Sequence, residues 1–263
     1  MTDNIFDPKS GELPATIPVF PLTGVLLLPD GSLPLNIFEP RYIAMIDHAL
    51  RNGRLVGMVQ PVQPNERDNF GGLAGVTDPD DERVDPEAVE RELSALRGEP
   101  EKPSVKTPAL YETGCVGRIV QFEETDDGRY IVVLKGLSRF RIVNEHPVAS
   151  GGYRTVDVSW DEYGHDLLML QEASSDSGVI NRDQLIPSLK TFFDLHGLSA
   201  DWEAIERTPD DKLVTTLCMI CPFAPGEKQA LLEAPDLNSR AEIMQTLIDM
   251  AAHQGDDAPA IRH

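Results

Sequence analysis

Four prolines divide the apolar residues near the start of this chain into short runs and limit what these runs can form. The prolines lie between residues 17 and 35, at Pro18, Pro21, Pro29 and Pro34. Because proline has no backbone N–H, the runs can form only short strands or edge strands joined by sharp turns. From Pro40 the apolar residues recur at helical spacing until Asn52-Gly53, which predicts one short helix.

The rest of the chain predicts strands first and helices afterwards. Strand-like runs at residues 117–122 and 129–134 flank a hairpin turn signal at residues 125–128, and two more runs follow at 139–143 and 153–160. Helical patterns dominate from residue 167. The predicted helices cover residues 183–195, start at the acidic turn after Ser199, at Pro209 and at Pro225, and cover residues 239–252.

Residues 62–107 interrupt the strand patterns with an acidic segment. They carry 12 acidic and 6 basic residues together with several prolines and glycines, and they offer few residues for a core. We therefore expect a mobile insertion. One helix is predicted inside it, between Asp85 and Gly98.

Three blocks of sequence, in this order and spacing, resemble the N-terminal domain of Lon proteases. Residues 17–42 match P-[LIV]-F-P-L … L-x-[IL]-F-E-x-R-Y, residues 114–142 match G-x-x-[GA]-x-I … G-x-x-R-[FV]-x-[IL], and residues 227–240 match E-K-Q-x-L-L-E … R. In that family the domain binds substrate and cuts nothing. The resemblance covers most of the chain, from residue 17 to about residue 249.

The resemblance implies an α+β fold, in which a PUA-like β-barrel lobe is followed by an α-helical bundle lobe. The barrel lobe is expected at residues 16–163, including the acidic insertion, and the helical lobe at residues 164–252. Residues 1–15 and 253–263 are expected to be flexible tails. The order of strands and then helices also appears directly in the patterns.

The charge of the chain argues against broad binding to nucleic acid or to membranes. There are 44 acidic and 23 basic residues, which gives a formal net charge of −21. Such a field repels phosphate backbones and anionic lipid, so an RNA-binding role, which PUA-like barrels have elsewhere, is disfavoured. No apolar run approaches the ~20 residues of a membrane-spanning helix, and the first residues show no signal pattern, so we expect a cytoplasmic protein.

Motifs for nucleotide-driven or hydrolytic chemistry are missing from the sequence. It contains no G-x-x-x-x-G-K-[ST], H-E-x-x-H, G-x-S-x-G or G-x-G-x-x-G, and its six histidines are scattered without ligand spacing. We therefore predict a protein that is not an enzyme and needs no cofactor. The alternative is an enzyme of unknown type, such as a hydrolase, whose site is assembled from distant residues.

The cysteines have two interpretations. Cys218 and Cys221 form a C-x-x-C, which is typical of redox pairs and of metal sites, but only Cys115 remains as a further sulfur ligand. Both lie in an apolar helical segment before Pro222. The sequence favours buried structural thiols and no metal site.

Seven residues are candidates for substrate binding, on the basis of the resemblance and of their residue types: Phe20, Leu28, Phe38, Glu39, Arg41, Tyr42 and Arg139. Each also has a structural interpretation. Glu39 and Arg41 suit a helix start and an ion pair, and the aromatic residues suit a core. Arg139 and Arg141 alternate with apolar residues, so they form either a polar binding face or a salt-bridged outer face of the barrel.

The resemblance implies a free-standing, Lon-type substrate-binding module without the ATPase and peptidase domains. We expect it to hold unfolded or partly folded polypeptides as an adaptor or holdase, or to bind a protease or chaperone partner. Apolar contacts and backbone pairing at a barrel edge would provide the binding. The sequence does not indicate the oligomeric state.

Overall fold

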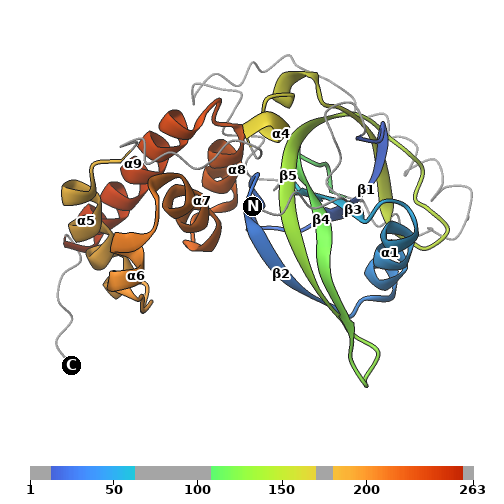
Figure 1. The fold of residues 1–263 in the computed structure, drawn as a ribbon, viewed down its shortest axis with the longest axis horizontal. Helices are drawn as coiled ribbons and strands as arrows, with labels where there is room; N and C mark the ends of the chain where they lie inside the picture. Colours follow the sequence, from blue (N-terminus) through green and yellow to red (C-terminus); the bar gives the residue numbers. More distant parts are fainter. Residues whose placement is uncertain (1–12, 63–107, 170–179, 257–263) are drawn as a thin grey trace, which may run out of the picture. The chain divides into compact units, whose positions relative to one another are not determined.

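One mixed β-sheet that closes on itself forms the first part of the fold (Figure 1). This is a computed structural model, and it describes residues 13–62, 108–169 and 180–256. Its strands are β1 (Thr16–Pro21), β2 (Ser32–Ile37), β3 (Leu55–Val59), β4 (Thr113–Glu124), β5 (Tyr130–Glu145) and β6 (Arg154–Ser159). They follow the order β2-β5-β4-β3-β1-β6, and a further pairing of β5 with β6 closes the barrel.

Strand β5 allows this closure because it is 16 residues long. Its first part pairs with β2 and β4, and its last part pairs with β6. Gly136 lies where the chain between β1 and β2 crosses β5. A Cβ there would lie 2.0 Å from the carbonyl oxygen of Leu28, so only glycine permits this approach.

Helices make up the rest of the described structure. They are α1 (Pro40–Arg51), the short 3-10 helix η1 (Asp161–Tyr163), α4 (Asp166–Met169), α5 (Arg182–Leu195), α6 (Trp202–Arg207), α7 (Asp210–Ile220), α8 (Pro225–Glu233) and α9 (Leu237–Asp256). The predicted start at the acidic turn is confirmed, since Asp201 accepts a 3.0 Å hydrogen bond from the Ala204 amide. Helix α9 is longer than predicted at both ends and reaches Asp256.

The predicted α+β fold, strands followed by helices, is confirmed. The strands and the helices belong to a single compact unit. The acidic insertion and its predicted helix lie outside the described residues, as do most of the two tails, so their mobility stays a prediction. The boundary between two lobes at residue 163 stays a prediction as well.

Apolar residues of the barrel and of the helices share one core. Leu27 and Met45 from the first part of the chain belong to the same buried cluster as Phe192, Leu217 and Met244. A second cluster, which includes Phe140 and Val156, is formed by the strands together with Leu167 of α4. The shared core means that the helices are packed onto the barrel rather than tethered to it.

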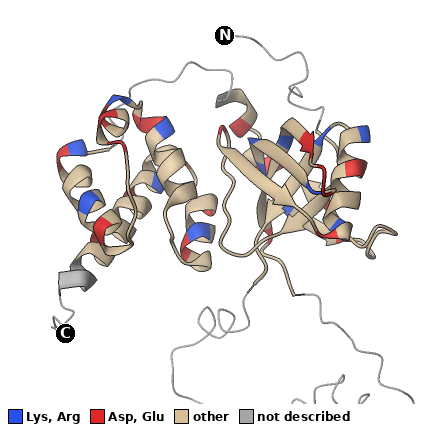
Figure 2. Cartoon of the chain, turned by 90° about the horizontal axis from the view of Figure 1, so that it is seen from below, with Lys and Arg blue, Asp and Glu red and all other residues tan. Residues whose placement is uncertain are grey.

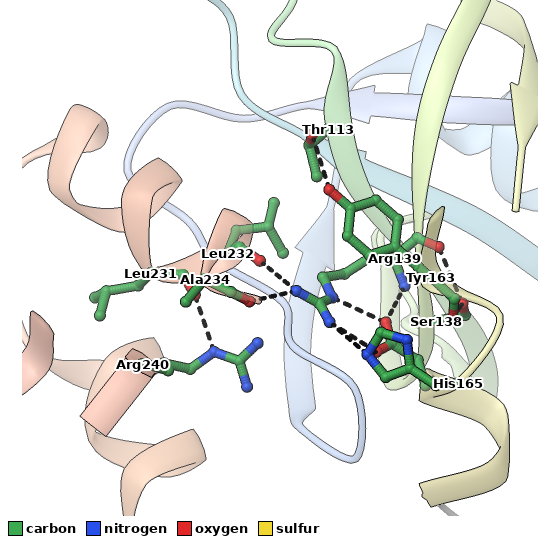
Figure 3. A network of polar contacts seen from close by, with 10 residues as sticks. Thr113, Ser138, Arg139, Tyr163, His165, Leu231, Leu232, Ala234 and Arg240 are labelled. Carbon is green, nitrogen blue, oxygen red and sulfur yellow. Dashed lines mark hydrogen bonds and ion pairs between the residues drawn. The ribbon is translucent and has the colours of Figure 1, made fainter. Parts of the chain in front are cut away.

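A buried arginine joins the two parts of the fold (Figure 3). Arg139 on β5 has only 2% of its surface exposed. Its Nε and Nη2 donate to the two carboxylate oxygens of Asp166 at 2.9 and 2.8 Å, and its Nη1 donates to the carbonyls of Leu232 and Ala234 at 3.2 and 2.6 Å. The guanidinium also lies 4.5 Å from the centre of the Tyr163 ring.

Arg141, by contrast, is exposed on the surface. It forms ion pairs with Glu112 at 2.6 Å and with Glu162 at 3.2 Å. The interpretation of a salt-bridged outer face therefore holds for Arg141, whereas it is wrong for Arg139. Alternation along the strand predicted that both arginines point to the same side, but α4 and the end of α8 cover only Arg139.

We expect Arg139→Met to lower the free energy of unfolding by about 3–5 kcal/mol, because Asp166 would remain buried without its partner. Arg141→Met is the matched control, since it removes an exposed arginine two residues away on the same strand. Chemical denaturation of both variants measures the difference. Equal stability of Arg139→Met and the wild type would show that the buried pair does not hold the fold together.

Candidate functional site

A groove of about 370 Å³ opens where β1, β2 and α1 meet. Three segments line it: residues 20–23 at the end of β1, residues 35–37 at the end of β2, and residues 38–42 at the start of α1, without residue 40. The prolines explain this meeting point. Pro21 is the last residue of β1, and Pro40 is the first residue of α1, so both elements stop or start beside the groove.

Aromatic side chains form the apolar part of the groove. The rings of Phe20 and Tyr42 are buried, and their centres lie 4.2 Å apart. Phe38 also lines the groove, but 65% of its surface is exposed to solvent. A large exposed aromatic residue beside a buried aromatic pair is typical of a site that binds apolar groups.

The charged residues of the groove neutralise each other. The Arg41 Nη2 lies 2.7 Å from the Glu39 carboxylate, and both side chains are largely exposed. The same guanidinium lies 4.5 Å from the centre of the Tyr42 ring. Burial raises the pKa of the Tyr42 hydroxyl, which keeps it neutral. The groove therefore presents no net charge to a ligand.

The structure brings five of the seven candidate residues together in this groove: Phe20, Phe38, Glu39, Arg41 and Tyr42. The other two lie elsewhere and are buried. Leu28 is fully buried in the core, and Arg139 lies in the network that joins barrel and helices. Neither can contact a ligand in this conformation, so only the five residues in the groove remain candidates.

Several groove residues were not among the candidates. Leu22, Thr23, Leu35, Asn36 and Ile37 also line the groove. They belong to the same proline-rich segment, but the sequence shows neither where the chain turns back nor which strand ends meet. Their spacing along the chain gives no signal of the groove, whereas the fold does.

A second hollow, of about 560 Å³, lies near the start of β1 and the end of α1. Its walls include His48 and His146, and the His146 Nε2 lies 2.7 Å from an Asp157 carboxylate oxygen. The same Asp157 oxygen accepts a 2.6 Å hydrogen bond from the Thr16 hydroxyl. Within residues 13–62, 108–169 and 180–256, no group of three or more histidine, cysteine or acidic side chains is arranged to hold a metal ion.

The C-x-x-C cysteines lie on and just after α7. Cys115, Cys218 and Cys221 are all buried and are not paired in disulfides. Burial raises the pKa of the Cys218 and Cys221 thiols to about 12, and it raises the pKa of Cys115 as well. Such thiols are poor nucleophiles, in agreement with the structural interpretation.

Charged residues of both signs are distributed over the helices (Figure 2). No helix in the described part of the chain is long and apolar enough to cross a membrane.

Comparison with known proteins places these features in a family. The family model of the "ATP-dependent protease La (LON) substrate-binding domain" matches residues 16–250. The chain belongs to this family. The match includes all the residues that line the groove.

Similar proteins include Lon proteases of several bacteria. The chain is 24% identical to Lon protease 2 of Myxococcus xanthus over 241 residues, which are 90% of this chain and 24% of that protein. It is 26% identical to Lon protease 1 of Bdellovibrio bacteriovorus, covering 86% and 23% of the two chains, and 23% identical to the Lon protease of Escherichia coli, covering 89% and 24%. The chain thus spans about a quarter of the length of these relatives.

Two solved structures are also similar to this chain. The Lon N-terminal domain protein from Xanthomonas campestris has a TM-score of 0.48 and 19% identity, covering 89% of this chain and 96% of that one. The N-terminal domain of the Mycobacterium avium complex Lon protease has a TM-score of 0.49 and 17% identity. That match covers 90% of this chain and 98% of the other.

The pKa values of the cysteines predict low reactivity toward alkylating reagents. At pH 8, a thiol with a pKa near 12 is ionised in about one molecule in ten thousand, and burial also blocks access. We expect iodoacetamide to label the native protein very slowly at this pH and all three cysteines quickly after denaturation. Mass spectrometry measures the labelling. Rapid native labelling of Cys218 or Cys221, or stoichiometric zinc in the purified protein, would contradict a purely structural role.

Proposed function

We propose that this protein binds unfolded or partly folded polypeptides through the groove between β1, β2 and α1, without catalysis. The observation that carries the proposal is the exposed Phe38 beside the buried pair of Phe20 and Tyr42, in a groove without net charge. An unfolded chain exposes apolar side chains that a folded protein hides, and an apolar groove accepts such side chains with little regard to sequence.

Membership of the Lon substrate-binding family supports a polypeptide as the ligand. We infer an adaptor or holdase role in cytoplasmic protein quality control, in which the bound chain is kept accessible or passed to a protease or chaperone. The formal net charge of −21 serves this role, since like charges keep complexes apart in solution.

The groove should lose affinity when its exposed aromatic residue is shortened. We expect Phe38→Ala to weaken the binding of a labelled unfolded protein about tenfold, because a large apolar contact is lost. Val143→Ala is a suitable control, since Val143 on β5 is similarly exposed and does not line the groove. Fluorescence anisotropy titrations measure both affinities, and thermal unfolding shows whether both variants are folded.

Raising the salt concentration from low to moderate should change this affinity little, because the binding is apolar, whereas binding to phosphates would collapse. A labelled RNA should bind poorly under the same conditions. Tight RNA binding, or no affinity for any unfolded chain, would refute the proposed function.

We also expect the purified protein to hydrolyse neither ATP nor unfolded casein. The reason is that the sequence lacks a phosphate-binding loop and the hydrolase motifs H-E-x-x-H and G-x-S-x-G. Phosphate release and gel electrophoresis measure the two activities. Hydrolysis that persists through repeated purification would favour the alternative, an enzyme whose site is assembled from distant residues.

A further inference from the structure

Strand β2 has an outer edge that no other described strand pairs with. It stands at the end of the strand order, and β5 is its one neighbour among the described strands. Along β2 every second residue is exposed, namely Ser32, Pro34 and Asn36. An unpaired edge of this kind exposes backbone groups that can pair with another chain.

The pairing of β2 with β5 fixes which backbone groups point outward. The Gly136 amide donates to the Gly31 carbonyl at 2.9 Å, so this carbonyl points toward β5 and the N–H of the next residue, Ser32, points away from it. The direction of the backbone N–H and C=O groups alternates along an antiparallel strand. The backbone groups of Leu33 and Leu35 therefore point toward β5, and those of Ser32, Pro34 and Asn36 point away from it. Pro34 thus lies where its missing N–H removes no hydrogen bond to β5.

The outer edge therefore offers two N–H donors, from Ser32 and Asn36, and three carbonyl acceptors. The two donors are four residues apart, about 13 Å in an extended strand. Pro34 leaves a gap between them. A long, uninterrupted ladder with a second copy of this chain is disfavoured, because two such gaps would fall within a six-residue strand.

The end of this edge runs into the groove. Asn36 lines the groove, and the exposed Phe38 lies two residues further on. An extended segment paired with Asn36 would thus bring its next side chains to the aromatic residues. Edge and groove form one continuous surface, with backbone groups on one part and apolar groups on the other.

The charges around this surface indicate what it binds. At the start of β2, Asp30 forms ion pairs with both Lys135 and Lys212. At its end, Glu39 is paired with Arg41. In a chain with a net charge of −21, a surface whose charges are paired fits an uncharged apolar segment better than a basic or a phosphorylated one.

We propose that the outer edge of β2 binds an uncharged, extended segment of an unfolded polypeptide as an additional strand, hydrogen-bonded at Ser32 and Asn36, with an apolar side chain in the groove. The inference rests on the proposed function and gives it a geometry. Backbone pairing provides affinity for any extended sequence, and the gap at Pro34 keeps that affinity low enough for release.

A pair of peptides tests the proposal on the unmodified protein. The first is a labelled, uncharged peptide with alternating apolar residues, and the second is the same peptide with alternate backbone nitrogens methylated on its pairing side. Both carry the same side chains, but the second cannot donate to a strand edge. We expect the methylated peptide to bind about tenfold more weakly, the effect of losing one or two net hydrogen bonds.

Substitutions on β2 provide the complementary test. Asn36→Pro removes an outward N–H and no bond to β5, and Asn36→Ala removes the same side chain while keeping the N–H. We expect Asn36→Pro to bind the unmethylated peptide about three- to tenfold more weakly than Asn36→Ala. Pro34→Ala adds the missing donor and should bind it more tightly.

The outcomes separate this inference from the proposed function. Equal binding of both peptides by the wild type would overturn strand addition and leave groove binding intact. No binding of unfolded protein or of either peptide would refute the proposed function itself. If Asn36→Pro fails to fold, the comparison of the two peptides on the wild type still tests strand addition.

Discussion

The arrangement of strands and helices depends on the buried arginine of β5. A buried guanidinium is tolerated only where its charge is neutralised and its N–H groups are hydrogen-bonded. Arg139 meets this condition with groups from both parts of the fold. Asp166 neutralises its charge, and the carbonyls of Leu232 and Ala234 accept hydrogen bonds from Nη1. These carbonyls lie at the end of α8, where a helix leaves acceptors without partners. The guanidinium thus donates to carbonyls at the end of α8 that have no partner within the helix.

Further hydrogen bonds join α8 to the barrel and to α7. The buried Lys228 donates to the carbonyls of Gly24 and Met219 at 2.9 and 3.1 Å. Gln229 donates to the Thr113 carbonyl at 3.1 Å, and Gln60 donates to the Pro225 carbonyl at 2.9 Å. The E-K-Q block, which resembles the pattern of Lon proteases, therefore has a structural role. It connects α8 to the strands and to the chain that follows β1.

This connection extends to the groove. Leu22 and Thr23, which form part of its wall, directly precede Gly24, and the Gly24 amide donates to the Gln60 side chain at 3.0 Å. The position of the wall is thus set by α8 as well as by the barrel. The groove itself consists of residues from the first part of the chain. Its shape nevertheless depends on side chains of α8, which gives a physical reason for the helices to accompany the strands.

Local chemistry made much of this predictable from the sequence. Missing proline donors limited β1 and β2 to short strands, and acidic first turns indicated the starts of α6 and α7. The burial of Leu28 and Arg139 could not be predicted in this way. Alternation and residue type indicate which side of a strand a residue takes, but not which distant segment covers that side. Leu28 is covered because Gly136 lets the chain cross β5, and Arg139 is covered because α8 ends over it. Both contacts join residues far apart in sequence, so they become visible only in the fold. The same holds for the groove, whose walls come from two strand ends and one helix start. The prolines indicated that an edge would exist, whereas the pairing with β5 shows that Pro34 faces outward and leaves one donor on either side of it.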